Sequence, residues 1–251
     1  MADRLRTIDI LSKLSHAALN ILFPPLCMHC HAYIDDPHRP LCPRCHDNLE
    51  RNTALQCPIC DIRLANNRRI CHHGAHADKR FPYLLGAACN YDDPIIRSCI
   101  HACKYQGSHA ATSFFAQLLA DHIRALQPAP SILSMSPTVI PIPLHPSKER
   151  KRGFNQSALI AKAFARTMEL PYDEPLIKTV NSMPQAQTKT HTERFEHMIG
   201  AFSVPHPHTV QNKNIILIDD VSTSGATLSE ATRSLKAAGA KQILALVVAR
   251  A

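Results

Sequence analysis

Residues 215–228 read IILIDDVSTSGATL, an apolar run followed by two acids and by a turn that is rich in hydroxyl side chains. The apolar run 215–218 predicts a buried strand of a parallel sheet, and we expect the chain to turn at Asp219 and Asp220 into a helix that starts near Ala226. Ligands of open α/β sheets bind beyond the carboxyl ends of such strands. The stretch therefore predicts an α/β fold and a ligand site at its turn.

The turn carries groups that suit a ribose phosphate. Successive backbone N–H groups, hydroxyl side chains and a glycine precede a helix start, where an anion is favoured. Two adjacent carboxylates suit the hydroxyls of a ribose attached to that phosphate. An ordinary capped turn, in which Ser and Thr start the helix, is the alternative. The candidate residues are Asp219 and Asp220 for the ribose, and Val221, Ser222, Thr223, Ser224, Gly225, Ala226 and Thr227 for the phosphate.

Strand and helix patterns alternate through the rest of residues 81–251. This alternation predicts a parallel sheet with helices on both faces. The expected strands are 83–91, 138–142, 175–180, 214–219 and 242–249, and the expected helices are two stretches within 93–126, then 155–168 and 226–238.

A basic segment follows the second of these strands. Pro141 and Pro143 are unfavourable inside a central strand, so they mark the point where the strand ends and a loop begins. Cations on that loop would lie opposite the acidic turn and could bind a pyrophosphate, since Arg donates two parallel hydrogen bonds. A solvated basic loop is the alternative. The cations are Lys148, Arg150, Lys151 and Arg152.

Paired cysteines dominate the segment 27–80. The pairs CMHC and CPRC are separated by eleven residues and can bring four thiolates to one tetrahedral metal, which is the spacing of a structural zinc site. Such a metal would replace the apolar core that this segment lacks. The predicted ligands of this first zinc are Cys27, Cys30, Cys42 and Cys45.

A second zinc site would begin with the pair CPIC and continue with Cys71. Gly74 stands where a fourth cysteine would complete the pattern, but imidazole can replace thiolate on zinc. The histidines beside it are His72, His73 and His76, of which we take His73. The predicted ligands are then Cys57, Cys60, Cys71 and His73; alternatively, this ribbon has no metal and is held by packing alone.

The first 26 residues read as a short amphipathic helix. Charged residues interrupt the start of the chain, which lacks a secretory signal, and no apolar run is long enough to span a membrane, so we expect a cytoplasmic protein. The predicted organisation is a helix at 1–26, a double zinc ribbon at 27–80 and an α/β domain at 81–251. The formal net charge of +8 permits an anionic partner.

The stretch 215–228 resembles the signature of type I phosphoribosyltransferases. The resemblance implies a parallel sheet flanked by helices that binds phosphoribosyl pyrophosphate, usually with magnesium. Asp219 and Asp220 would hold the ribose hydroxyls, and residues 221–227 would hold the 5′-phosphate.

Three further stretches narrow the resemblance. The cysteine pairs, CKYQG at 103–107 and RGFNQSALIA at 152–161, together with the acidic turn, resemble the ComF/GntX family. In that family a zinc ribbon precedes a phosphoribosyltransferase-like domain, and members are linked to DNA uptake in natural transformation, after DNA has entered the cytoplasm as a single strand. This chain departs from the family pattern at Gly74, His197 and Ser224. The residues that match its motifs are Lys104, Arg152, Phe154, Asn155, Gln156, Arg194 and Phe202.

Two functions remain open at this point. The first is a transferase that moves the phosphoribosyl group to an unknown acceptor. The second is a module without catalysis that senses this ligand, or binds single-stranded DNA or proteins of the DNA-import machinery. Scarce aromatic residues, at 5%, disfavour base stacking, although arginines of the ribbons could contact phosphates. The catalytic residues cannot be assigned from these patterns.

Overall fold

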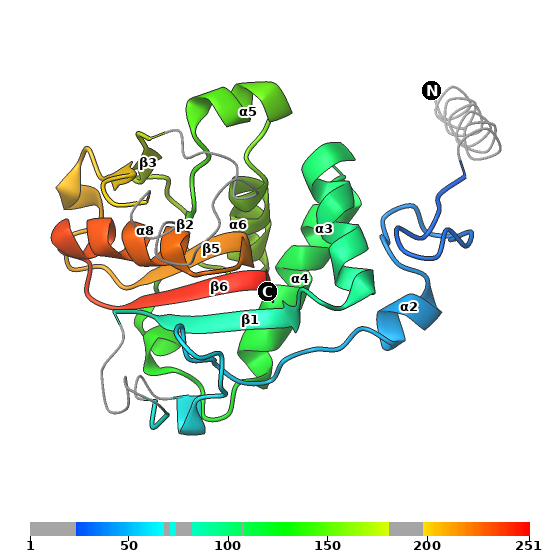
Figure 1. Cartoon of the computed structure of the whole chain (residues 1–251), viewed down its shortest axis with the longest axis horizontal. Helices are drawn as coiled ribbons and strands as arrows, with labels where there is room; N and C mark the ends of the chain where they lie inside the picture. The colour runs from blue at the N-terminus through cyan, green and yellow to red at the C-terminus, as the bar shows by residue number, and fades with distance from the viewer. Residues whose placement is uncertain (1–23, 68–70, 74–81, 107, 181–197) are drawn as a thin grey trace, which may run out of the picture.

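A four-stranded parallel sheet forms the centre of the protein (Figure 1). The computed structural model describes residues 24–67, 71–73, 82–106, 108–180 and 198–251. Within them the strand order is β1-β6-β5-β2, which confirms the predicted parallel sheet. The strands are β1 (Leu84–Asn90), β2 (Thr138–Pro141), β5 (Ile215–Ser222) and β6 (Ile243–Arg250).

Helices cover both faces of this sheet, also as predicted (Figure 1). Because side chains alternate along a strand, Ile216 and Ile218 of β5 pack in one core and Ile215 and Leu217 in the other. The first core receives α3 (Pro94–Gln106), α4 (His109–Ala125) and α6 (Gln156–Thr167), and the second receives α8 (Ala226–Ala237).

Strand β5 is longer than the sequence pattern predicts. We expected the strand at 214–219 and the turn at Asp219 and Asp220, but the strand continues to Ser222, so both acids lie inside it. The reason is the neighbouring strand, because Asp219 pairs in register with Val247 and Ser222 with Arg250. The acids are therefore held by the backbone of the sheet, and the turn occupies only residues 223–225.

The basic loop predicted after β2 is instead a short helix, α5 (Pro146–Arg152). Pro146 at its first turn has the backbone angle that a helix start requires, and the His145 side chain accepts a hydrogen bond from the Ser147 N–H. Gly153 ends the helix in the left-handed conformation, at a φ of 86°. All four predicted cations lie on this helix.

The strand predicted at 175–180 is only two residues long. It is β3 (Ile177–Lys178), which pairs antiparallel with β4 (Phe202–Ser203) in a separate small sheet. Of residues 175–180 only Leu176 is buried, which is too little apolar surface to fix a strand of the main sheet.

Irregular segments lie along both outer strands of the main sheet. Residues between the two cysteine groups follow β1, where the Asn52 N–H donates to Ala88 O at 2.8 Å and the Gln56 N–H to Leu85 O at 2.9 Å. On the other side the Val139 N–H donates to Pro171 O at 2.8 Å. The remaining short elements are α2 (Pro43–Asp47) and 3-10 turns at Ala65–Asn67, Ser131–Met135 and Pro207–Thr209.

Some predictions fall outside the described residues. These are the helix at 1–26, apart from its last three residues, and the positions Gly74, His76, Arg194 and His197. No helix among the described residues has the length and apolarity that crossing a membrane requires.

Candidate ligand site at the carboxyl edge of the sheet

The two acids lie side by side and almost fully buried. Asp219 is 8% exposed and Asp220 6%. The Ser157 hydroxyl of α6 donates to Asp219 Oδ1 at 2.8 Å, and the Asp220 N–H donates to the same oxygen at 2.9 Å. Burial, reinforced by the charge of Asp220, raises the pKa of Asp219 to about 7. The protonation of Asp219, and so the charge of the pair, therefore depends on the groups that contact the two carboxylates.

A lysine supplies the nearest countercharge. Lys104 Nζ, from the last turn of α3, lies 3.1 Å from Asp220 Oδ2. Burial disfavours its charge, but Asp220 outweighs burial and the pKa of Lys104 is raised. The structure thus joins the CKYQG stretch to the acidic strand.

A glutamine extends the same network. The Gln156 side-chain amide donates to Asp220 Oδ2 at 3.3 Å, while its carbonyl oxygen accepts a hydrogen bond from Arg152. Asn155 starts α6 by accepting from the Ser157 N–H and donating to Ile142 O. The stretch RGFNQS therefore connects α5 to the acids.

The predicted cations divide into two groups. Lys148 and Arg152 are partly buried, whereas Arg150 and Lys151 are exposed and, among the described residues, make no contact with the acids. The structure adds Lys178 of β3. Burial and the charge of Lys148 lower the pKa of Lys178, and the charge of Asp219 partly opposes this shift. Positive charge from two elements thus faces the acidic strand.

The hydroxyl-rich loop follows directly. Val221, Thr223 and Thr227 are partly exposed, and the others are buried. Gly225, at a φ of 74°, precedes α8, and the Ala226 N–H donates to Ser224 Oγ at 3.4 Å. The next N–H groups of the first turn have no partner within the helix and point to where an anion could bind. The Ser222 hydroxyl is buried and has no hydrogen-bond partner in the described part of the chain. These are the groups that an anion would need.

The raised pKa of Asp219 leads to a prediction for Asp219→Asn. Between about pH 4 and pH 7 the folded protein keeps a proton that the unfolded chain has lost, so wild-type stability falls as the pH rises through this range. Asparagine can accept the same two hydrogen bonds without a charge. We expect the variant to be more stable than wild type at pH 8, by roughly 2–4 kcal/mol, and the difference to vanish near pH 4.

Urea denaturation at pH 4, 6 and 8 measures this difference. The exposed Asp92→Asn is the control and should follow the wild-type profile. A gap between Asp219→Asn and wild type that does not change with pH would contradict the assignment.

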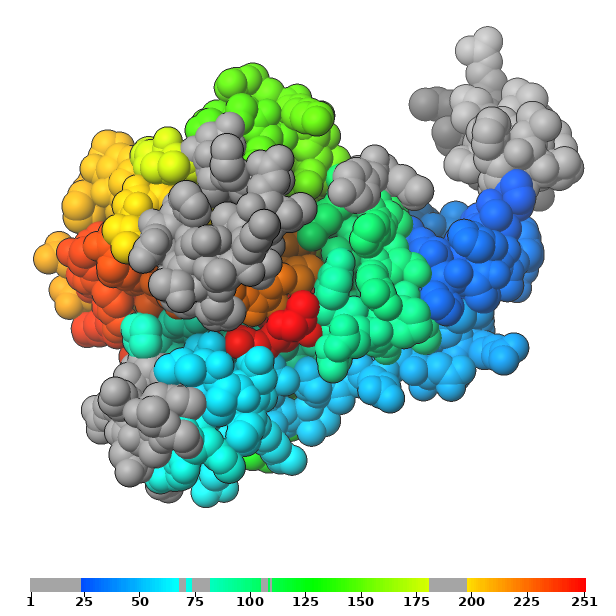
Figure 2. All heavy atoms as spheres, in the orientation of Figure 1, coloured from blue at the N-terminus to red at the C-terminus, as the bar shows by residue number. Residues whose placement is uncertain are grey.

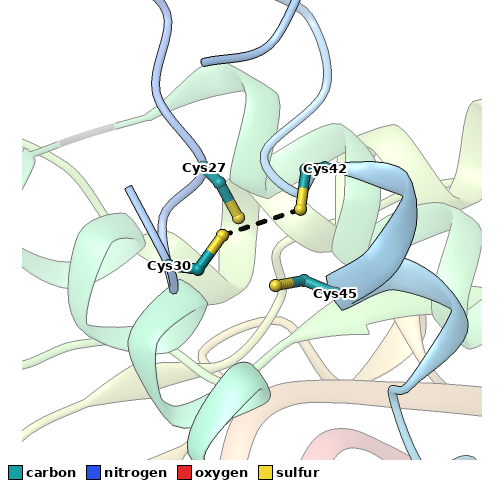
Figure 3. A group of neighbouring side chains, drawn as sticks. All are labelled: Cys27, Cys30, Cys42 and Cys45. Atoms are coloured by element: carbon teal, nitrogen blue, oxygen red, sulfur yellow. Dashed lines mark hydrogen bonds between the residues drawn. The ribbon is translucent and has the colours of Figure 1, made fainter. Parts of the chain in front are cut away.

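Four cysteines converge in the first ribbon (Figure 3). Their sulfurs all lie within 4.8 Å of one another, and Cys30 Sγ is 3.6 Å from Cys42 Sγ. Tetrahedral zinc with Zn–S bonds of about 2.3 Å requires sulfurs about 3.8 Å apart. Burial is outweighed by hydrogen bonds from the backbone of Cys30, Cys42 and His29, which lower the pKa of Cys27 to about 6. The cluster therefore fits a metal ion.

The second group contains three cysteines, Cys57, Cys60 and Cys71. Cys60 Sγ lies 3.6 Å from Cys71 Sγ. Both His72 and His73 are described, but within the described residues neither ring joins the group, so the proposed ligand His73 lies outside it. The group could hold a metal through three sulfurs plus a further ligand.

The ribbon arginines are partly engaged elsewhere. Arg39 pairs with Asp36, and Arg51 contacts both Asp121 and the His46 ring.

Four residues of the site were missed in the sequence. The Ser157 hydroxyl donates to Asp219, and Lys178 interacts electrostatically with Asp219. The Tyr83 hydroxyl lies near Gly225, and Arg250 donates to Pro58 O, which also lies near Gly225. Arg250 had a signal, since a charge directly after an apolar strand falls at the ligand edge. Lys178 had none, because its position depends on the small sheet.

Comparisons with known proteins identify the type of domain that carries the acidic strand and the loop. Residues 155–251 match the family model of the phosphoribosyl transferase domain. The chain is 28% identical over 120 residues to competence protein F of Haemophilus influenzae, covering 47% of this chain and 52% of that protein. It is 37% identical over 97 residues to competence protein ComFC of Bacillus subtilis, covering 39% and 37%.

Two more matches were found. The DNA utilization protein YhgH of Shigella flexneri is 25% identical over 151 residues, which are 60% of this chain and 65% of that protein. The chain thus covers less than two thirds of the length of each of these relatives. Among solved structures, a glutamine phosphoribosylpyrophosphate amidotransferase from B. subtilis aligns with a TM-score of 0.35 and 17% identity, over 55% of this chain and 26% of that one.

A phosphoribosyltransferase-type domain therefore accounts for residues 155–251, which include both acids and the loop. Paired cysteines precede that domain, and the relatives are named for competence or DNA utilization. These findings support the resemblance to the ComF family that the sequence motifs indicate.

Proposed function

We propose that the chain binds phosphoribosyl pyrophosphate, together with magnesium, at the carboxyl edge of the sheet. The observation that carries the proposal is the buried pair Asp219 and Asp220 near the carboxyl end of β5, with only residues 221–225 between the pair and the start of α8. The acids would accept hydrogen bonds from the ribose hydroxyls, and residues 221–227 would bind the 5′-phosphate. Magnesium would neutralise part of the pyrophosphate charge.

The pyrophosphate would meet the cations on the opposite side of the acids. Lys148, Arg152 and Lys178 come from α5 and β3, and Lys104 comes from α3. Lys104 and Arg152 already contact the acid network. Bound pyrophosphate would compete with Asp220 for Lys104, so donor binding and the ion pair should be coupled.

The names of the relatives support a role in DNA uptake. We infer that the chain takes part in natural transformation after single-stranded DNA has reached the cytoplasm, and that donor binding is its part in that process. Release of pyrophosphate with an added acceptor would identify a transferase. Retention of single-stranded DNA that weakens steeply with salt would identify a binding module instead.

Thermal denaturation with the donor tests the proposal. Magnesium with phosphoribosyl pyrophosphate at a hundredfold excess over Kd should stabilise wild type by about 2.7 kcal/mol. The double variant Asp219→Asn with Asp220→Asn should lose this stabilisation, because the ribose hydroxyls lose their charged acceptors.

The chain offers a matched control in its other neighbouring acids. Asp92→Asn with Asp93→Asn removes the same charges near the start of α3, and asparagine can keep the Asp93 hydrogen bond to the Ile95 N–H. This control should retain the full shift. Equal shifts in both double variants would refute the ribose site.

A further inference from the structure

The last residue of β6 is an arginine with unused hydrogen-bonding capacity. Arg250 is only 7% exposed. Its Nη2 donates to Pro58 O at 3.1 Å, and its Nε pairs with the Asp61 carboxylate. Among the described residues, its Nη1 has no hydrogen-bond partner. Buried polar groups in proteins are nearly always paired, so the open donor indicates a missing acceptor.

The guanidinium lies beside the phosphate loop. Pro58 O, which accepts from Arg250, is 3.8 Å from the position that a Cβ would take on Gly225, and the Tyr83 hydroxyl is 3.4 Å from it. Figure 2 shows the red carboxyl-terminal residues at the surface, next to the cyan segment that carries the second cysteine group. The loop, the arginine and this segment thus meet at one place.

A second buried group without a partner lies on the adjacent strand. Ser222 pairs in register with Arg250, is 3% exposed, and its hydroxyl makes no hydrogen bond to any described residue. An arginine donor and a serine hydroxyl therefore both lack partners at the same edge, next to the start of α8. One phosphate group could accept from both of them and from the helix N–H groups.

We propose that Arg250 is a phosphate-binding residue of this site and contacts the 5′-phosphate together with Ser222. The proposal rests on the proposed binding of phosphoribosyl pyrophosphate. Pro58 and Asp61 belong to the knuckle of the second cysteine group, so this knuckle positions the arginine. Asp61 is 54% exposed, so solvent screens its attraction to the guanidinium. The positive charge of Arg250 can therefore still attract an anion.

Titration calorimetry with ribose 5-phosphate tests the role of Arg250. Arg250→Gln removes the charge and should weaken binding about tenfold or more, as expected for a charge-assisted hydrogen bond. Arg250→Lys keeps a charge but loses the planar fork, so binding should weaken severalfold. Arg124→Met, which removes an exposed ion-paired arginine on α4, is the control and should bind as wild type does.

Ser222→Ala separates binding from folding. Because the hydroxyl has no partner among the residues that the structure describes, its removal should leave the Tm of the free protein unchanged or higher, while ribose 5-phosphate binds more weakly. Wild-type affinity in Arg250→Gln would overturn the inference; if that variant does not fold, wild-type affinity in Arg250→Lys would do so. Wild-type protein that binds neither ribose 5-phosphate nor phosphoribosyl pyrophosphate would instead refute the proposed function.

Discussion

Replacing Cys45 with alanine is expected to remove one zinc ion per chain and to unfold residues 24–49. Three sulfurs cannot complete a closed tetrahedral site, and the segment has little else to hold it. Apart from cysteines and Pro40, its buried apolar residues are Ile34, Leu41 and Leu49. Structural zinc contributes about 10–16 kcal/mol to the folding of such small units, far more than three side chains can supply.

Metal analysis and limited proteolysis measure this effect together. The variant should show one zinc ion fewer than wild type and new cleavage within 24–49, while cleavage elsewhere stays as in wild type. Cys89→Ala is the matched control, because Cys89 is fully buried in β1 and belongs to neither cysteine group. An unchanged zinc content in Cys45→Ala would exclude the four-cysteine site.

Removing the lysine beside the acids should have the second large effect. Lys104→Met leaves two buried carboxyl groups without their nearest cation, and breaking a pair of this kind costs about 2–4 kcal/mol after allowing for its partial exposure. The loss should be greatest at pH 8. At pH 5 it should be smaller, because the folded protein can then protonate Asp219, whose pKa is already raised.

Urea denaturation at pH 8 and pH 5 separates charge from packing. Lys104→Arg keeps the positive charge and should lose much less stability at pH 8 than Lys104→Met. An equal loss at both pH values would mean that Lys104 acts through the packing of its methylene groups alone.

The sequence predicted the elements whose local pattern of residues matches the structure that they form in the fold. The strand at 215–218 and the helix from Ala226 are both strongly patterned, and the four-cysteine cluster follows from spacing alone. These features depend on residues close together in the chain. For that reason one sequence was enough to find them.

The errors arose where distant residues decide the local structure. Acids normally end a strand, but pairing with β6 and contacts from Ser157 and Lys104 keep Asp219 and Asp220 inside β5. Prolines after β2 suggested a loop, although Pro146 begins α5. Arg250 was missed because its contacts are with Asp61 and with Pro58, which lies 192 residues earlier in the chain.

The segments along the outer strands also matter for the association of the protein. β1 and β2 are edge strands, and an uncovered edge can pair with another chain and lead to aggregation. Residues 52–56 occupy hydrogen-bonding positions of β1, and residues 171–173 do so for β2. The polypeptide between the two cysteine groups thus covers the edge strand β1. A chain shortened to residues 81–251 would leave the hydrogen-bonding groups of β1 open to pairing with another copy.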